Sequence, residues 1–249
     1  MCNLFLDSPG GYKIPCDCRI SGEESMVCII AHGFASSKES GTAQMMLAHL
    51  NAIGIGAIAF DFPCHGQSEA PFESLTVDAC LRDMACVETY IRNRLPGAEI
   101  VYFGSSFGGY CVICHLCSGK GWGNKAFLRC AAVDMDKTFG VKTDEVLYQL
   151  ESQGYYEYDP GFGGKMRLSG EFFDSLALRS PFDMELPQKA DIYMIHGLAD
   201  TVVSPKAARD FAFAKGCHIA LVPYAGHDIG TGEGIKALLR LTKWFFVKK

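Results

Sequence analysis

Two adjacent serines stand where an apolar run of the sequence is expected to turn into a helix. In YFGSSFGGYC, residues 102–111, Ser106 is the centre of the spacing G-x-S-x-G, and Ser105 occupies a variable position. That spacing predicts a sharp turn from a strand into a helix, which lifts the central hydroxyl above a sheet. The turn also puts the hydroxyl at a helix N-terminus, where free N–H groups favour developing negative charge. Ser106 is therefore the candidate nucleophile, whereas Ser105 is expected to be a turn residue.

A serine hydroxyl becomes a good nucleophile only when a base takes its proton and an acid orients that base. Where G-x-S-x-G forms such a turn, the expected chain order is Ser, then Asp or Glu, then His. Asp200 in HGLADTVVSP and His227 in YAGHDIG follow this order. Asp134 and Asp136, which follow the preceding expected strand, are alternatives for the acid. We expect Asp200, because it lies in a short loop just before a helix start.

Acyl transfer also needs two hydrogen-bond donors that point at the developing oxyanion. We expect one to be the backbone N–H of Phe107, directly after the nucleophile, and the other that of Phe34 in the segment HGF. Alone, HGF could be a turn that ends a strand, and a lone G-x-S-x-G could be a chance turn. The combination of motifs in the expected order is what predicts a serine hydrolase site.

Apolar runs alternate with amphipathic segments along the chain. The runs that indicate buried strands are residues 26–32, 55–62, 99–104, 127–133, 190–197 and 218–226. The segments with helical spacing or helix start signals are residues 38–54, 76–97, 204–216 and 234–249, with a further buried helix after Gly109. Alternating helices and continuously apolar strands predict an α/β protein whose mostly parallel sheet carries helices on both faces.

One segment interrupts this alternation. Residues 134–187 are rich in aromatic residues and glycine and contain no regular strand and helix pair. A loop of that length without structure is unusual in a globular domain, so we expect an inserted cap or lid. The predicted organisation is a core formed by residues 1–133 and 188–249, with the cap over 134–187.

Aromatic residues of this insertion are candidates for the wall of the substrate pocket. Tyr155, Tyr156 and Phe162 of the insertion could stack on an aromatic acyl group, or they could form the core of the cap itself. His32, at the end of the first apolar run, is a further candidate for the pocket wall.

Composition excludes several classes of partner. The 249 residues carry a formal net charge of −5 and no long run of like charges, so neither nucleic acid nor an anionic membrane surface is expected as a partner. There is no basic leader followed by an apolar stretch and no apolar segment of membrane-spanning length. We expect a cytoplasmic protein whose partner is a small-molecule ester; the oligomeric state stays open, a homodimer included.

Twelve cysteines are scattered along the chain, mostly within apolar runs. Cys111, Cys114 and Cys117 could share one face of a helix, but no second Cys or His pair with ligand spacing accompanies them. We therefore expect buried thiols in a reducing compartment and neither a metal nor an organic cofactor.

Five motifs together resemble those of a known superfamily. They are HGF (32–34), DFPCHGQSE (61–69), GSSFGG (104–109), HGLADTVVSP (196–205) and AGHDIG (225–230). In order and spacing they resemble the α/β-hydrolase superfamily over nearly the whole chain, and more narrowly the bacterial cinnamoyl or feruloyl esterases.

This resemblance implies the α/β-hydrolase fold, a nucleophile at Ser106, an acid at Asp200 and a base at His227. It further implies oxyanion amides at Phe34 and Phe107 and a small cap over the acyl pocket. The chain departs from those esterases at Phe107, where they commonly carry a polar residue.

The expected function is therefore hydrolysis of small carboxylic esters, hydroxycinnamoyl esters among them, through an acyl-enzyme. The same triad would also serve a monoacylglycerol lipase, a thioesterase or an S9-like peptidase. An alternative of another class is a non-catalytic ligand receptor built on this fold.

Overall fold

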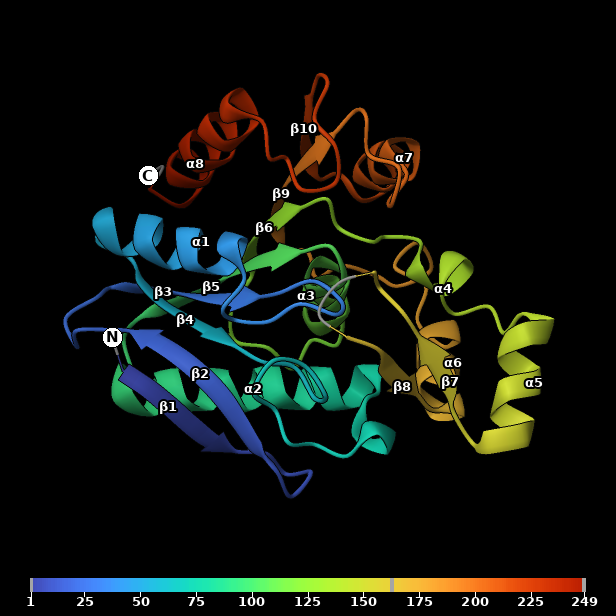
Figure 1. Cartoon of the computed structure of the whole chain (residues 1–249). Coiled ribbons are helices and arrows are strands. Elements are labelled where there is room, and N and C mark those ends of the chain that lie inside the picture. Colours follow the sequence, from blue (N-terminus) through green and yellow to red (C-terminus); the bar gives the residue numbers. More distant parts are fainter. Residues whose placement is uncertain (1, 162–163, 248–249) are drawn as a thin grey trace.

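The computed structural model describes residues 2–161 and 164–247 and arranges them around one large sheet (Figure 1). The sheet of the described residues has the strand order β1-β2-β4-β3-β5-β6-β9-β10. Its strands are β1 Cys2–Asp7, β2 Lys13–Arg19, β3 Met26–Ala31, β4 Gly56–Phe60, β5 Glu99–Ser105, β6 Lys125–Arg129, β9 Asp191–Gly197 and β10 His218–Val222. From β4 to β10 neighbouring strands are parallel, whereas β2 pairs antiparallel with β1 and β4. The predicted class, with a mostly parallel sheet, is confirmed.

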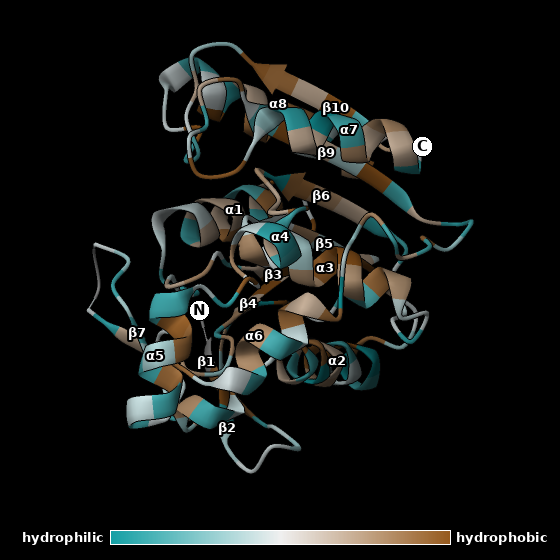
Figure 2. Cartoon of the chain, turned by 90° about the vertical axis from the view of Figure 1, so that its right-hand side faces the viewer, coloured by the Kyte–Doolittle hydropathy of each residue, from teal (hydrophilic) through white to brown (hydrophobic). Residues whose placement is uncertain are grey.

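Helices cover both faces of this sheet (Figure 1). They are α1 Gly41–Ala52, α2 Val77–Arg94, α3 Phe107–Cys117, α7 Pro205–Lys215 and α8 Gly232–Val247, with a short 3-10 helix at Phe72–Ser74. The helices α1 and α8 pack on one face and α2, α3 and α7 on the other, so that two hydrophobic cores enclose the sheet. Figure 2 shows β6 as a largely hydrophobic strand, as expected for a strand that is buried on both faces.

Two strands at the N-terminal edge were not expected from the sequence. The strands β1 and β2 form an antiparallel hairpin in which Leu4 pairs with Cys16 and Leu6 with Ile14. Pro15 lies inside β2, and proline is tolerated in a strand mainly at edges or bulges, which weakens the sequence signal. Alternating apolar residues on both sides of the turn SPGG are the pattern that could have revealed the hairpin.

The strand expected over 127–133 lies earlier. It is β6, and it ends at Arg129 because Cys130 turns the chain away with a φ of 45°. The carboxyl end of this strand therefore carries an arginine instead of an apolar residue.

The segment 134–187 lies outside the large sheet. It contains α4 Met135–Thr138, α5 Asp144–Gln153, α6 Gly170–Ala177 and a separate two-stranded sheet of β7 Tyr156–Tyr158 and β8 Met166–Leu168. Phe162, expected at the pocket, lies outside the described residues. No helix of the described residues is long and apolar enough to cross a membrane.

Candidate active site

Ser106 stands in the sharp turn between β5 and α3. Its backbone has a φ of 53° and a ψ of −116°, a strained conformation for a residue with a side chain. A Cβ at Gly104 would lie 2.7 Å from the Gly109 Cα, and a Cβ at Gly108 would lie 2.2 Å from the Ala31 carbonyl oxygen. The small residues of the motif are thus required by the close approach of the backbone.

A chain of hydrogen bonds joins Ser106 to the two other candidate triad residues. His227 Nδ1 lies 2.8 Å from Asp200 Oδ2, and His227 Nε2 lies 3.0 Å from Ser106 Oγ. A carboxylate only accepts hydrogen bonds, so Nδ1 carries the ring proton and Nε2 is free to accept the serine proton. Neither Asp134 nor Asp136, the alternative acids, bonds to His227 in the described chain.

The carboxylate of Asp200 is buried and receives several donors. Its Oδ1 accepts the backbone N–H groups of Val202 and Val203, both at 2.9 Å, and its Oδ2 lies 3.1 Å from His196 Nε2. Burial alone would raise the pKa of Asp200, but the hydrogen bonds from His196, His227 and the Val203 amide hold it well below its usual range. The acid therefore stays ionised and fixes the imidazole of His227.

His196 is a site residue that was missed in the sequence. It is the penultimate residue of β9, is fully buried, and its Nε2 also lies 3.1 Å from the Val203 carbonyl oxygen. Both neighbours of Nε2 are acceptors, so this nitrogen carries the proton and donates to Asp200. The available signal was its position four residues before Asp200, at the end of an apolar strand.

The ligand atoms of Cys130, His196 and Asp200 lie within 4.8 Å of one another, a spacing that could hold a metal ion. The Asp200 carboxylate already accepts hydrogen bonds from both His196 and His227, however, so this group supports the triad as it stands.

The loop after β3 lies against the nucleophile. A Cβ at Gly33 would lie 3.5 Å from Ser106 Cβ, an ordinary contact distance, which shows how close this loop lies to the nucleophile. Within the described residues, the N–H groups of Phe34 and Phe107 have no hydrogen-bond acceptor. These are the two amides expected to bind an oxyanion.

His32 fixes this loop from within the protein. Its Nε2 accepts the Phe62 N–H at 3.1 Å, so its Nδ1 carries the proton and donates to the Gly33 carbonyl at 2.7 Å. Burial lowers the pKa of His32 to about 4, so the ring is neutral. His32 borders the cavity beside Ser106, as expected, but both ring nitrogens are occupied by the protein.

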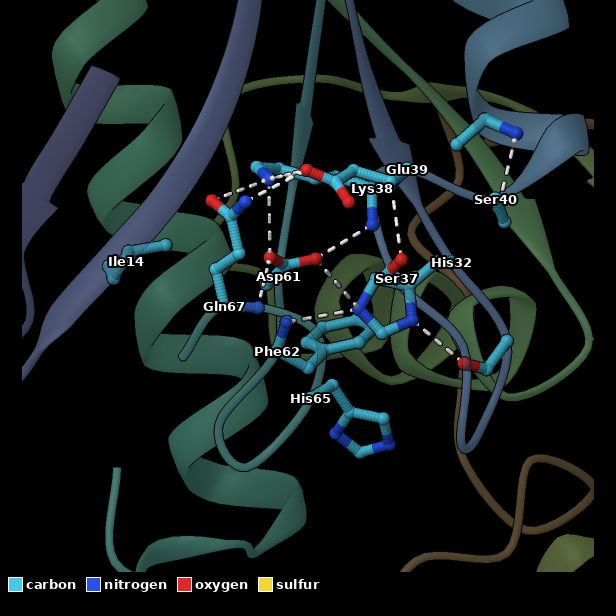
Figure 3. A network of polar contacts seen from close by, with 12 residues as sticks. Ile14, His32, Ser37, Lys38, Glu39, Ser40, Asp61, Phe62, His65 and Gln67 are labelled. Atoms are coloured by element: carbon cyan, nitrogen blue, oxygen red, sulfur yellow. Dashed lines mark hydrogen bonds and ion pairs between the residues drawn. The ribbon is translucent and has the colours of Figure 1, made fainter. Parts of the chain in front are cut away.

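A polar network holds the rest of the loop (Figure 3). Asp61 accepts the N–H of Lys38 at 2.7 Å and that of Gln67 at 2.9 Å, and Lys38 Nζ lies 3.6 Å from its second oxygen. The side chains of Asp61 and Lys38 are almost completely buried. The network ties the loop after β3 to the loop after β4, which keeps the Phe34 amide in place.

A cavity of about 320 Å³ opens beside Ser106. It is lined by the end of β3 and the loop after it, by the first turn of α1, and by Ser106, Arg129 and His227. Tyr155 and Tyr156, which were expected at the pocket, are not among its lining residues. Tyr155 packs on Phe72, and Tyr156 packs on Phe173.

Aromatic side chains fill the region on the other side of Phe34. Its ring contacts those of Phe107, Phe139, Tyr158 and Phe172 at centroid distances between 5.2 and 5.5 Å. Phe107 and Phe172 are completely buried. Phe107 thus contributes an apolar ring to this cluster, and Phe172 of segment 134–187 packs directly on it.

The model of the family Hydrolase_4, described as serine aminopeptidase, S33, matches residues 22–157, more than half of the chain. The chain belongs to this family. No curated protein sequence matches it. The matched range includes Ser106 and both oxyanion candidates, whereas Asp200 and His227 follow it.

Solved structures confirm the architecture of this Hydrolase_4 member. A putative hydrolase from Agrobacterium vitis S4 is 17% identical with a TM-score of 0.82, over 98% of this chain and 97% of that one. Est1E from Butyrivibrio proteoclasticus is 20% identical with a TM-score of 0.81, over 98% and 100%. Mouse alpha/beta hydrolase domain-containing protein 10 is 15% identical with a TM-score of 0.79, over 100% and 99%. At these identities the likeness shows the α/β-hydrolase fold alone.

Proposed function

We propose that this hydrolase-family protein is a serine esterase that cleaves small carboxylic esters through an acyl-enzyme. The observation that carries the proposal is the unbroken chain of hydrogen bonds from Asp200 through His227 to Ser106. The strained φ of Ser106 supports it, because backbone strain of this kind is kept where function requires it.

In the proposed reaction Ser106 Oγ attacks the carbonyl carbon while its proton passes to His227 Nε2. The oxyanion of the tetrahedral intermediate accepts the N–H groups of Phe34 and Phe107. His227 then gives its proton to the leaving alkoxide as the ester C–O bond breaks. Water attacks the acyl-enzyme with His227 as base, which releases the acid and restores Ser106, while ionised Asp200 holds the Nδ1 proton throughout.

The charge of the cavity distinguishes an esterase from an aminopeptidase. An aminopeptidase has to bind the cationic amino group of its substrate, which a carboxylate in the pocket does best. The residues that line this cavity include no Asp or Glu, and Arg129 is the cationic residue among them. This favours a substrate without an amino group over the peptidase alternative.

Hydroxycinnamoyl esters are the finer assignment that we propose to test first. The motif resemblance supports it, as does the fold likeness to Est1E, which has been solved with ferulic acid bound. A methyl ferulate assay compared with a medium-chain p-nitrophenyl ester separates this assignment from a lipase-like preference. Faster turnover of the feruloyl ester supports the assignment, and exclusive use of the medium-chain ester contradicts it.

The esterase proposal is tested with Ser106→Ala and with Ser118→Ala as the matched control. Ser118 caps the opposite end of α3, where its hydroxyl donates to the His115 carbonyl at 2.7 Å. We expect Ser106→Ala to lower kcat on p-nitrophenyl acetate by roughly 10⁴-fold or more and Ser118→Ala to leave it nearly unchanged. Retained turnover in Ser106→Ala would overturn the proposal, and absence of turnover on every ester would favour a non-catalytic receptor.

A further inference from the structure

Arg129 is a buried cation that the catalytic scheme does not use. It is the last residue of β6, only 7% of its surface is exposed, and it lines the cavity beside Ser106. Its Nε donates to Ser105 Oγ at 3.2 Å and its Nη1 donates to the His227 carbonyl at 2.7 Å. Both acceptors are uncharged, and Nη2 donates no hydrogen bond within the described residues.

No carboxylate of the described residues forms an ion pair with this guanidinium, although the charges of Asp228 and Asp200 stabilise it through space. Burial lowers the pKa of Arg129, yet arginine keeps its proton at neutral pH. Burying a charge without a counter-charge is costly, and buried arginines are therefore normally paired. Asp228 and Asp200 act on the guanidinium only through space, and its Nη2 has no hydrogen-bond acceptor among the described residues, so this group is free to bind an anion at the open cavity.

The first turn of α1 adds donors to the wall of the same cavity. This helix has 12 residues, and its cap Ser40 accepts the N–H of Ala43 at 3.3 Å. The N–H groups of Gly41 and Thr42 have no acceptor in the described part of the chain, as is normal in the first turn of a helix. The helix dipole adds a partial positive charge at this end.

We propose that this cavity binds an anionic oxygen group of the substrate, a carboxylate or a phosphate, between Arg129 and the N-terminus of α1. A planar guanidinium suits both groups, because its parallel N–H donors match two oxygens at once. The inference rests on the proposed esterase function and narrows its substrates to esters that carry a negative charge. It also explains why an arginine stands at this strand end.

Two matched pairs of esters test the proposal and separate the two sources of charge. The carboxylate pair is the p-nitrophenyl half ester of succinate against p-nitrophenyl pentanoate. The phosphate pair is 1-acetylglycerol 3-phosphate against 1-acetylglycerol. We expect kcat/KM to be higher for the anionic member of at least one pair, by roughly tenfold or more.

Variants separate charge recognition from support of the site, because Arg129 also contacts Ser105 and His227. In Arg129→Met the preference for the anionic ester should fall at least tenfold relative to the neutral one, and Arg129→Lys should restore part of it. Thr42→Glu should lower the ratio of kcat/KM for the anionic ester to that for the neutral ester. Thr42→Gln, in which the new side chain has the size of Glu but no charge, should lower it less. A wild-type preference for the neutral member of both pairs, or a ratio unchanged in Arg129→Met, overturns the proposal.

A binding measurement keeps the inference testable without turnover. We expect calorimetric titration to show that succinate or inorganic phosphate binds the wild-type protein and binds Arg129→Met at least tenfold more weakly. Binding without any ester turnover would leave the anion site standing and remove the esterase function. Turnover of neutral esters without anion binding would leave the esterase function standing and remove the anion site.

Discussion

The regions on the two sides of Phe34 have opposite characters. On one side, aromatic rings of segment 134–187 pack on Phe34, and that of Phe172 also packs on Phe107. On the other side, a cavity opens between α1 and Arg129, with unpaired donors in its wall. The Phe34 ring joins the aromatic cluster while the residue also borders the cavity.

The two regions differ in their role, since one contributes to the stability of the fold and the other to the recognition of substrate. A filled aromatic region contributes packing energy and holds the Phe34 loop against Ser106, whereas an open polar cavity contributes a place for substrate. The sequence left both roles open for the aromatic residues of segment 134–187, and in the structure several of them pack on Phe34 and on one another. Segment 134–187 packs against the Phe34 loop, and in our proposal the opposite side of the site accepts the ligand.

The largest effect on the aromatic side is expected from Phe172→Ala. Phe172 is completely buried and its ring contacts Phe34 and Phe107. Its loss should lower the free energy of unfolding by about 3–5 kcal/mol, as measured by urea denaturation. Phe213→Ala is the control: Phe213 is 91% exposed, so its loss should change the stability by less than about 0.5 kcal/mol. Equal effects of the two variants would contradict a packed aromatic region.

A second test of the buried side is the pH dependence of stability. Burial lowers the pKa of His32 to about 4 and that of His65 to about 3, from an ordinary value of 6.5. Between these values the unfolded chain binds protons that the folded chain does not, so stability falls as the pH falls through this window. From pH 6.5 to 5 each histidine should cost about 1.6 kcal/mol of stability.

The matched variant for this test is His65→Asn, whose amide can replace the donor to the Pro63 carbonyl at 2.8 Å. This variant should lose about half of the pH dependence of the free energy of unfolding that we attribute to the imidazole rings of His32 and His65. An equal wild-type free energy of unfolding at pH 6.5 and pH 5 would contradict the statement that His32 and His65 are buried as neutral imidazoles.

A smaller effect is expected where the triad acid is supported. His196→Leu removes the donor to Asp200 Oδ2 at 3.1 Å and should lower kcat about tenfold, with little change in KM. His196→Gln keeps an N–H donor and should recover part of that loss. Steady-state kinetics at neutral pH measure both variants, and an unchanged kcat in His196→Leu would show that His196 does not position the acid.

The smallest effect is expected from Tyr155→Ala. Tyr155 packs on Phe72 and beneath the Arg167 guanidinium, away from the residues that line the cavity. Values of kcat/KM for small esters should change by less than about twofold, because the interactions with substrate are unaltered. A large loss of kcat/KM that depends on the substrate would place the acyl group on the aromatic side of Phe34. It would contradict the difference in role between the two regions.

Much of the architecture could be predicted because the spacing of apolar residues and the order of the motifs can be read directly from the sequence. Apolar runs gave the parallel strands, and Ser106, Asp200 and His227 were chosen by their order at strand ends. Only the folded chain brings these three side chains within hydrogen-bond distance of one another.

The features that were missed depend on the tertiary structure. The end of β6 was misplaced because the turn at Cys130, with its positive φ, has no glycine to mark it, and Arg129 was therefore hidden inside an expected strand. The buried role of Phe107 depends on partners that are distant in the sequence, such as Phe172. The spacing of apolar residues along the chain cannot indicate on which side of the site these aromatic rings pack.

Covalent labelling of the nucleophile tests the central claim most directly. The purified protein is treated with a fluorophosphonate, and peptide mapping by mass spectrometry locates the adduct. The account predicts one adduct, on Ser106, that is absent from Ser106→Ala and forms far more slowly in His227→Ala, because His227 Nε2 lies 3.0 Å from the attacking oxygen. An adduct on another residue, or labelling of His227→Ala at the wild-type rate, would contradict it.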